Sequence, residues 1–361
     1  MLRLGQVQSS RFRRDAWLEV NLSNLEFNVK SLYEEFQKPL IPVLKADAYG
    51  HGANVLTELL DSYDFIYAYA VASIDEALNL REVSKKKIMV LGITPVWALE
   101  NAIVSDVDVT ITDLDTAKEA DAIAAKLAKK AKIHLKIDTG MNRIGFKVLE
   151  ESKAQIKEIA ELKNLQIESA YTHIASPDDK EYSMFQEESF FEMMKDFNFK
   201  LHPAASIAAR NCKNKNFDFV RVGIELYGLE NSSLKPLLSL YSRISFVKNI
   251  KKGESVSYGR TWKAQKDTKI ITLPLGYADG VHRLMSNKIK AFYKDKLISQ
   301  VGTITMDQMM FDAEDLDAKA GDLVELFGEK ISIDAWAQAA ETINYEVATS
   351  LNLRLPKTYS R

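Results

Sequence analysis

The residue best placed to do chemistry is Lys45, which ends an apolar run and opens the sequence KADAYGHG. In a barrel of parallel strands, the carboxyl ends of the strands form the catalytic face. A lysine withdrawn from water at such a strand end loses proton affinity, and its neutral amine can form a Schiff base with a carbonyl compound. Position alone favours a lysine that ends a strand and whose ammonium group reaches solvent. Further motifs are therefore needed to choose between these interpretations.

The composition excludes several kinds of protein. The 361 residues include 48 Lys and Arg against 50 Asp and Glu, a formal net charge of −2, which argues against a partner such as nucleic acid. Cys212 is the only cysteine, so the chain has neither an internal disulfide nor a cysteine cluster for zinc. The five histidines are too scattered to form a recognisable metal motif, and we predict no metal site. Any catalysis must come from Lys, Arg, Tyr or a cofactor.

Membrane association and export are not expected either. No apolar run approaches the roughly 18 residues that a membrane span requires. The N-terminus contains arginines, but the apolar segment of a secretory signal does not follow them. We expect a cytoplasmic protein.

The elements that position Lys45 alternate between strands and helices. Helical periodicity covers 113–130 and 150–162, with Asp113 and Ser152 as candidate N-caps. Such alternation predicts parallel pairing, and about eight strands in some 220 residues predict an α/β fold with a (β/α)₈ TIM-like barrel over 14–236. The predicted strands are 40–45, 66–71, 87–91, 107–112, 133–138, 167–173, 201–205 and 219–223.

A second domain is expected because single cores rarely exceed about 250 to 300 residues. After Pro236 short alternating runs are separated by turns, with one helical stretch near 334–342. This pattern predicts a mainly-β domain over 237–361, with which residues 1–13 would pair. Its predicted strands are 243–249, 269–275, 289–293, 297–302, 308–311, 323–327 and 331–333.

The segment VLKADAYGHG (43–52) resembles the motif with which alanine racemases hold pyridoxal 5′-phosphate. The resemblance extends over nearly the whole chain and implies an isomerase that interconverts L-alanine and D-alanine and supplies D-alanine for peptidoglycan. The other similar segments follow in order: HLKIDTGMNRIGF (134–146), YTHIASPD (171–178), VRVGIELYG (220–228), VSYG (256–259), LPLGYADG (273–280), TMDQ (305–308) and INYEVATSLNLRLPKTY (343–359).

By this resemblance, Lys45 carries the cofactor as a Schiff base. The loops after the seventh and eighth predicted strands would help to bind its phosphate, which agrees with where barrels commonly bind phosphate. The phosphate contacts that the resemblance implies are Tyr49, one helical turn after Lys45, Ser206, the backbone amides at Gly223 and Ile224, and Tyr345.

Arg221 matches the family arginine that faces the pyridine nitrogen of the cofactor. Arginine stays protonated and only donates hydrogen bonds, so it leaves that nitrogen unprotonated and limits side reactions. His173 resembles the histidine that supports this arginine.

Racemisation removes a proton from one face of Cα and returns one to the other face, which two acid–base groups do most simply. By resemblance these are Lys45 and Tyr258. An unperturbed tyrosine has a pKa near 10 and needs a nearby positive charge to act at neutral pH; Arg143 resembles the family residue that orients the cofactor hydroxyl and the substrate carboxylate there. The family arrangement implies a homodimer in which Tyr258 serves the partner's barrel.

Other positions have implied roles at the same site. The Met306 amide and Asp307 would lie near the substrate carboxylate, and Tyr277 and Arg283 would line the corridor by which substrate enters. Lys136 matches a lysine that many members carbamylate to fix the neighbouring arginine.

Two departures from the family pattern bear on specificity. Ala205 replaces a common asparagine before Ser206, and Thr305 replaces a common cysteine, which leaves the substrate preference and cofactor affinity open.

Three other functions are compatible with parts of this pattern: a racemase of broader range for serine or basic amino acids, a cofactor-binding barrel without activity, and a related two-domain decarboxylase. The second needs no β domain with Tyr258. The third would place a carboxylate, not Arg221, at the pyridine nitrogen.

Overall fold

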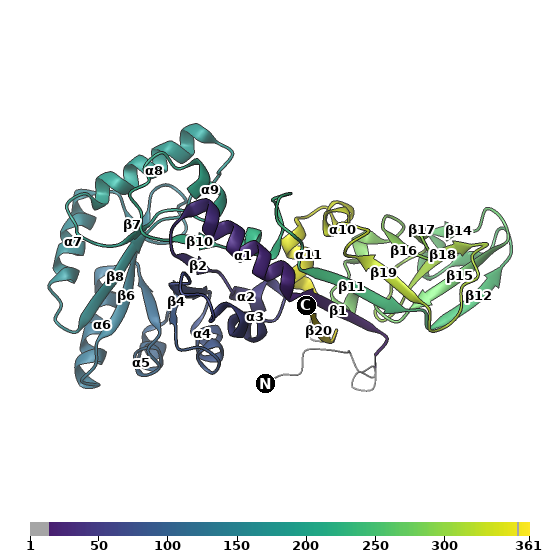
Figure 1. Cartoon of the computed structure of the whole chain (residues 1–361), viewed down its shortest axis with the longest axis horizontal. Coiled ribbons are helices and arrows are strands. Elements are labelled where there is room, and N and C mark those ends of the chain that lie inside the picture. The colour runs from purple at the N-terminus through teal and green to yellow at the C-terminus, as the bar shows by residue number, and fades with distance from the viewer. Residues whose placement is uncertain (1–13, 352–353) are drawn as a thin grey trace. The chain divides into compact units, whose positions relative to one another are not determined.

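The computed structural model describes residues 14–351 and 354–361, which divide into two units (Figure 1). The barrel unit comprises residues 28–48 and 53–226, and the β unit comprises residues 14–27, 49–52 and those from 227 on. The expected pairing of residues 1–13 lies outside the described residues.

The barrel unit is built on parallel strands, each of which overlaps one of the predicted runs. They are β2 (Leu40–Pro42), β3 (Ala68–Val71), β4 (Lys87–Ile93), β5 (Asp108–Ile111), β6 (Ala131–Asp138), β8 (Leu165–Tyr171), β9 (Leu201–His202) and β10 (Val220–Val222). The short strand β7 (Phe146–Lys147) lies against β6.

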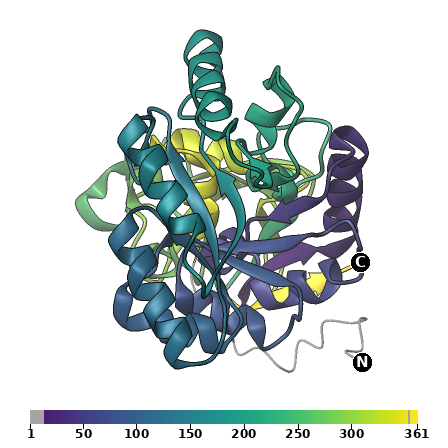
Figure 2. The same ribbon diagram turned by 90° about the vertical axis from the view of Figure 1, so that its left-hand side faces the viewer.

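These strands form a ring. One sheet has the order β3-β4-β5-β6-β8-β9, and β10 pairs with β2 in another. Parallel backbone bridges connect the two sheets on both sides: Leu40 with Ile66, Val43 with Ala70, and Ala205 with Arg221. The predicted TIM-like barrel is thereby confirmed, and Figure 2, in which this unit faces the viewer, shows the helices outside its strands.

The helices follow the strands in turn. They are α1 (Leu22–Phe36), α2 (Lys45–Tyr49), α3 (Ala53–Leu60), α4 (Ile74–Arg81), α5 (Val96–Val104), α6 (Leu114–Lys126), α7 (Glu150–Ala160), α8 (Lys180–Met194) and α9 (Ser206–Asn211), with the 3₁₀ turn η1 (Ile224–Tyr227).

The predicted caps have different outcomes. Asp113 caps α6, accepting from the amide of Thr116 at 2.7 Å. Ser152 does not cap α7, because the helix begins earlier, after Leu149, and Ser152 is buried in its first turn.

The β unit contains a nine-stranded sheet in the order β12-β15-β18-β17-β16-β19-β11-β1-β20, and a separate pair, β13 with β14. Only β1 and β20 run parallel within the large sheet. The strands are β1 (Ala16–Asn21), β11 (Leu238–Arg243), β12 (Phe246–Ile250), β13 (Ser255–Val256), β14 (Trp262–Lys263), β15 (Thr268–Leu273), β16 (Lys290–Tyr293), β17 (Lys296–Gln300), β18 (Met309–Glu314), β19 (Leu323–Phe327) and β20 (Lys357–Ser360). The mainly-β character predicted for this region is confirmed.

Short helices complete the β unit: η2 (Tyr258–Arg260), η3 (Tyr277–Asp279), η4 (Arg283–Met285), α10 (Ile333–Ala340) and α11 (Asn344–Ser350). The strand predicted at 331–333 is wrong, because Ser332 caps α10 by accepting from the amide of Asp334 at 3.1 Å. Residues 16–21, which we had grouped with the barrel, form β1 and pair with β11 and β20.

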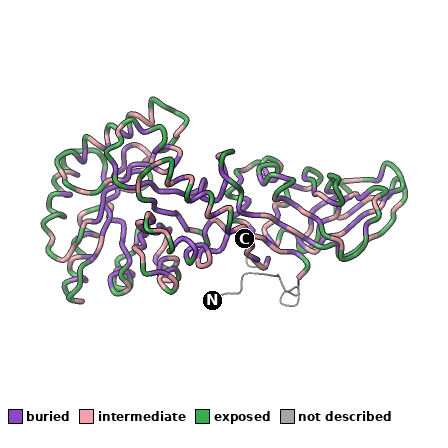
Figure 3. The backbone as a smooth tube through the Cα atoms, viewed as in Figure 1, coloured by how far each residue is buried: buried purple, intermediate pink, exposed green. Residues whose placement is uncertain are grey.

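The strands of the barrel unit are buried along most of their length (Figure 3). Apolar side chains dominate, as expected for strands covered on both faces. The exceptions are polar and include Lys136, His134, His202 and Arg221, each at most 3% exposed. Buried polar groups require partners, so they mark positions whose role goes beyond packing.

No helix among the described residues is long and apolar enough to cross a bilayer.

Candidate active site

Lys45 follows β2 and begins a turn with an unusual backbone. Ala46, Asp47, Ala48 and Tyr49 all have φ between 52° and 54°, in the left-handed region. We expected Tyr49 one helical turn after Lys45; the structure has one turn, but a left-handed one. Such a conformation costs L-residues roughly 1–2 kcal/mol each. It persists only where surrounding contacts enforce it.

Glu76 provides one of those contacts. Its carboxylate accepts the amide of Ala46 at 2.7 Å and the amide of Ala72 at 2.7 Å, which ties the residue after Lys45 to the end of β3. Ser73 caps α4 through the amide of Glu76, so the helix start orients this carboxylate. This role of Glu76 is not evident from the sequence, because a capping residue ordinarily serves only its own helix.

The environment of Lys45 favours a neutral amine. Burial lowers the pKa of Lys45, the positive charge of Arg143 lowers it further, and the charge of Glu76 opposes the shift. Arg143 itself is exposed. It follows a turn in which Asp138 accepts the amides of Gly140 and Asn142 at 3.1 and 2.9 Å.

Lys136 is buried on β6. Its Nζ donates to the carbonyl of Ile137 at 2.8 Å and lies 5.6 Å from the ring centroid of Tyr171. Burial, followed by the charge of Arg221, lowers the pKa of Lys136 to about 7. A large fraction of this amine is therefore unprotonated at neutral pH.

Arg221 on β10 is held by acceptors from neighbouring strands. It donates to the carbonyl of Thr172 at 2.7 Å and to Nδ1 of His202 at 2.8 Å, and its Nη2 lies 3.4 Å from Nδ1 of His173. Burial lowers the pKa of Arg221 to about 10, so its guanidinium remains charged at neutral pH. The structure therefore brings the two predicted residues Arg221 and His173 together.

His173 lies where several positive charges converge. Burial is the largest cause that lowers its pKa to about 3, and the charges that add to it belong to Arg221, Arg143, Lys136 and Lys45. His173 is thus neutral at neutral pH. A region that contains the charged guanidinium groups of Arg221 and Arg143 is suited to an anionic ligand.

The two loops predicted to bind phosphate lie on adjacent strand ends. Ser206 is buried at the first position of α9, and Gly223 directly precedes η1. Ala205 forms a backbone bridge with Arg221, which joins the two loops. Ala205 caps α9 without a side-chain hydrogen bond, so the departure from asparagine removes a polar group at this helix start.

The predicted phosphate contacts Tyr49 and Tyr345 belong to the β unit. Burial, with a smaller effect of Tyr345, raises the pKa of Tyr49 to about 12, which keeps its hydroxyl protonated and able to donate. The ring of Tyr49 lies 4.9 Å from that of Tyr227. Gly50 follows with φ +83°, and a Cβ there would lie 2.5 Å from the carbonyl oxygen of Ala348, so only glycine fits.

Tyr258 lies at the surface of the β unit, with 74% of the residue exposed. Its backbone is fixed, because Thr303 donates to the carbonyl of Tyr258 at 2.8 Å and Ser257 donates to the carbonyl of Thr303 at 2.6 Å. The loop is therefore rigidly placed while the phenol is left in solvent.

Met306 and Asp307 form the tip of a neighbouring turn. The hydroxyl of Thr305 donates to the carbonyl of Gln308 at 2.9 Å and so closes this turn, which gives the departure from cysteine a structural role. Met306 is 53% exposed, and Arg354 donates to Asp307 at 2.7 Å.

The corridor residues lie beside that turn. The amides of Tyr277 and Ala278 donate to the carbonyls of Thr305 and Met306, each at 3.0 Å. Arg283 begins η4 shortly after. The β unit thus collects Tyr258, Met306, Asp307 and Tyr277 on connected loops.

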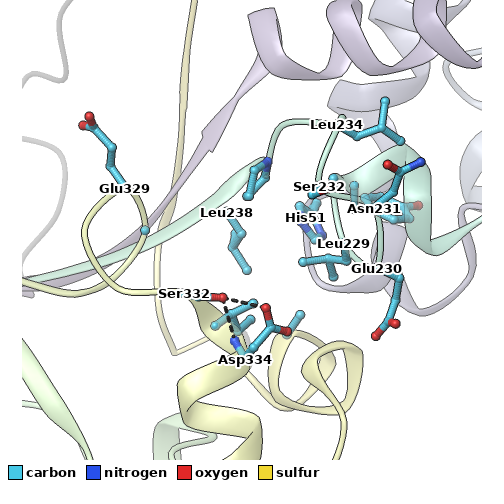
Figure 4. Close-up of a pocket in the computed structure, with 16 residues that line it drawn as sticks. His51, Leu229, Glu230, Asn231, Ser232, Leu234, Leu238, Glu329, Ser332 and Asp334 are labelled. Carbon is cyan, nitrogen blue, oxygen red and sulfur yellow. Dashed lines mark hydrogen bonds between the residues drawn. The ribbon is translucent and has the colours of Figure 1, made fainter.

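The β unit also contains a pocket of about 470 Å³ (Figure 4). His51, Glu230 and Asp334 are among its lining residues, and none of the residues with a predicted role lines it. Within the described part of the chain, no group of His, Cys, Asp or Glu is arranged to hold a metal ion.

Known proteins share the two-unit organisation of this chain. The family model for the alanine racemase N-terminal domain matches residues 20–231, and the model for the C-terminal domain matches residues 237–359. The chain belongs to the alanine racemase family.

Individual alanine racemases are similar over nearly their full length. The enzyme of Clostridium novyi (strain NT) is 39% identical, over 96% of this chain and 95% of the relative. The solved alanine racemase of Clostridium difficile 630 is 34% identical with a TM-score of 0.90, over 97% of this chain and 96% of that one. The alanine racemase of Bartonella henselae, solved with covalently bound pyridoxal phosphate, is 26% identical with a TM-score of 0.87, over 96% and 99%.

Membership in the alanine racemases makes the chain an isomerase that interconverts L-alanine and D-alanine. The predicted fold and family are confirmed, and the comparisons do not favour the racemase of broader range.

Proposed function

We propose that the chain racemises alanine with pyridoxal 5′-phosphate bound to Lys45, and that Lys45 and Tyr258 move the protons. The observation that carries the proposal is the partly buried Lys45 amine, whose pKa is lowered, in a region where the guanidinium charges of Arg221 and Arg143 act on His173. A cofactor with an aldehyde and a phosphate supplies the carbonyl that the amine needs and the negative charge that the cations need.

The residues present fit this cofactor by the chemistry of their donors. Lys45 offers an amine whose pKa is lowered, Arg221 offers N–H groups that cannot accept, and Ser206 offers a buried hydroxyl at a helix start. The phosphate would be held by Ser206, the amides at Gly223 and Ile224, Tyr49 and Tyr345. When bound, pyridoxal phosphate draws electrons from Cα of the amino acid and makes its proton acidic.

The chain's own groups then perform the racemisation. The Lys45 amine becomes free to carry a proton once the substrate amine has displaced it. One of Lys45 and Tyr258 would then take the proton from Cα, and the other would return a proton to the opposite face. Arg143 orients the substrate carboxylate, with the Met306 amide and Asp307 beside it. His173 supports Arg221, and Tyr277 and Arg283 line the corridor for substrate.

We also propose that two subunits share each site in a homodimer. Tyr258 is 74% exposed in the single chain, although an acid–base group works best where water is excluded. A second subunit would supply the missing cover, with the barrel of one copy receiving Tyr258 of the other.

Lys136 is proposed to carry a carbamate. Its neutral amine can add carbon dioxide and release a proton, which converts a cationic side chain into an anionic one near Arg143. Protein incubated with ¹³C-bicarbonate should show a carbamate carbon signal that is missing from the Lys136→Ala variant. The same spectrum from both proteins would contradict the proposal.

The proposed function is tested by absorbance and product analysis. Purified protein with pyridoxal phosphate should absorb as a Schiff base and form D-alanine from L-alanine, and Lys45→Ala should do neither. A panel of L-amino acids tests substrate range. Turnover of lysine or arginine as efficient as that of alanine would contradict the assignment to alanine.

A further inference from the structure

Five buried polar side chains form a row inside the barrel unit. They come from β5, β6, β8, β9 and β10, and each is at most 3% exposed: Asp108, His134, Ser169, His202 and Arg221. The links are Arg221 Nη1 to His202 Nδ1 at 2.8 Å, His202 Nε2 to Ser169 Oγ at 2.7 Å, Ser169 Oγ to His134 Nδ1 at 2.6 Å, and His134 Nε2 to Asp108 Oδ2 at 3.3 Å. The row joins Arg221 to a carboxylate by unbroken contacts.

The chemistry of the groups fixes the direction of the first links. Arg221 can only donate, so Nδ1 of His202 must accept, and the proton of this neutral imidazole lies on Nε2. That N–H donates to Ser169. Burial and the charge of Arg221 hold the pKa of His202 well below its ordinary value, consistent with the neutral ring.

The same argument continues to Asp108. The hydroxyl of Ser169, which accepts from His202, donates to Nδ1 of His134, and the single N–H of a neutral His134 ring then lies on Nε2 and points at Asp108. The opposite arrangement, in which Nδ1–H of His134 donates to Ser169, would leave the fully buried hydroxyl hydrogen of Ser169 without an acceptor among the described residues. Every donor in the row therefore points away from Arg221.

Asp108 is the terminal acceptor. Its other oxygen, Oδ1, is buried without a hydrogen-bond partner among the described residues. Arg221 has no carboxylate within ion-pair distance in the part of the chain that the structure describes, and its other acceptors are backbone carbonyls and His173. The row is thus the link between this buried cation and a buried carboxylate.

We infer that Asp108 is a positioning residue that acts on Arg221 through His134, Ser169 and His202. A negative charge at the end of a hydrogen-bonded chain polarises each link, so His202 accepts more strongly from Arg221. The remaining N–H groups of Arg221 then donate less strongly to the group they face. The inference rests on the proposed function, in which that group is the ring nitrogen of the cofactor.

The first test is nitrogen NMR of the cofactor-free protein labelled with ¹⁵N-histidine, which has only five histidine signals to assign. His134 and His202 should both be neutral with the proton on Nε2. A doubly protonated His134 or the other tautomer of His202 would overturn the inference, and this outcome needs no variant.

The second test uses Asp108→Asn, which removes the charge but keeps an oxygen that can accept from His134. The His202 signals should shift although three hydrogen bonds separate the two residues. Asp106→Asn is the matched control, because Asp106 carries a charge two residues away on an exposed side chain paired with Lys132. In the Ser169→Ala background, Asp108→Asn should no longer shift His202. An unshifted His202 in the Asp108→Asn protein would show that no charge is transmitted.

A third measurement connects the row with catalysis. Asp108→Asn should change kcat for alanine by about threefold to tenfold, with KM within about twofold, and shift the absorbance band of bound cofactor. If the Asp108→Asn variant had the kcat and the cofactor absorbance band of the wild type, the inference would be contradicted. Failure of the wild-type protein to racemise alanine would instead contradict the proposed function. The NMR experiments would still test whether charge is transmitted along the row, because they use the cofactor-free protein.

Discussion

The two units hold their proposed acid–base groups in opposite ways. In the barrel unit Lys45 is partly buried, and burial together with the charge of Arg143 lowers the pKa of Lys45. The next residue, Ala46, is held by a hydrogen bond from its amide to Glu76. In the β unit Tyr258 is 74% exposed, and Thr303 holds its backbone carbonyl. The barrel thus supplies both position and electrostatic environment, whereas the β unit supplies position alone. The environment of Tyr258 must come from elsewhere, which is the physical argument for a shared site.

Loss of Lys45 should have the largest effect and should differ from loss of Tyr258 in what happens to the cofactor. Lys45→Ala should lower alanine racemisation by about 10⁴-fold or more, because it removes the cofactor attachment and one proton carrier together. Tyr258→Phe should lower it by about 10²- to 10⁴-fold and retain the cofactor absorbance.

Isotope exchange gives the sharper readout for Tyr258→Phe. The equilibrium constant of racemisation is 1, so kcat/KM falls equally in both directions whichever group is lost. Loss of an α-deuteron to solvent should nevertheless continue for the one enantiomer whose proton faces Lys45. Equal loss of exchange from both enantiomers would contradict the assignment of one group to each face.

Mixing the two inactive variants tests the sharing of sites. A mixed dimer of Lys45→Ala and Tyr258→Phe chains has one site with both residues intact if Tyr258 acts on the partner's barrel. Random mixing of equal amounts should then restore about one quarter of wild-type activity. Each variant refolded or mixed with itself is the control. No recovery from the mixed sample, with mixed dimers demonstrated, would place both residues in the same chain.

Glycine substitutions compare backbone packing in the two units. Gly145, with φ +122°, would place a Cβ 2.7 Å from the carbonyl oxygen of Lys136, whereas Gly253, with φ +89°, has nothing within 4 Å. Gly253→Ala should lower the free energy of unfolding by about 1 kcal/mol through backbone strain alone. Gly145→Ala should lower it by about 3 kcal/mol or more, because β6 must also move. Denaturant unfolding measures both, and equal losses would contradict this difference.

Acid should destabilise the barrel unit through His173. The pKa of this residue is lowered to about 3 in the folded chain, while the unfolded chain takes up the proton near 6.5, so stability is lost as pH falls through this interval. At pH 5 the loss should be about 1–2 kcal/mol. The difference in unfolding free energy between wild type and His173→Gln should therefore change between pH 7 and pH 5, in favour of the variant. A difference independent of pH would contradict the neutral, buried state of His173.

The sequence predicts the barrel well because its strands are short apolar runs that end in chemically distinctive residues. Lys45 and Arg221 are recognisable for this reason. Ser206 follows one predicted strand and Gly223 ends the next, which places both at the carboxyl ends of neighbouring barrel strands. β1 and β20 were not predicted as strands. Their pairing partners lie far along the chain, and local sequence patterns do not encode such pairing.

The missed contacts have a different cause. Glu76 reaches back about one βα unit to Ala46, and Ser169 becomes informative only once register places it opposite His134 on β6. The left-handed turn after Lys45 could not be read either, because its four residues include no glycine. Tertiary contacts override local preference at these positions.

That turn has a consequence for the handedness of the chain itself. Four successive L-residues in the left-handed region follow the mirror image of an ordinary helical turn, which is the conformation that D-residues adopt without strain. Ala46 and Ala48 could therefore be exchanged for D-alanine by chemical ligation with little change in the path of the backbone. The segment that leads away from Lys45 already follows the course of a D-peptide.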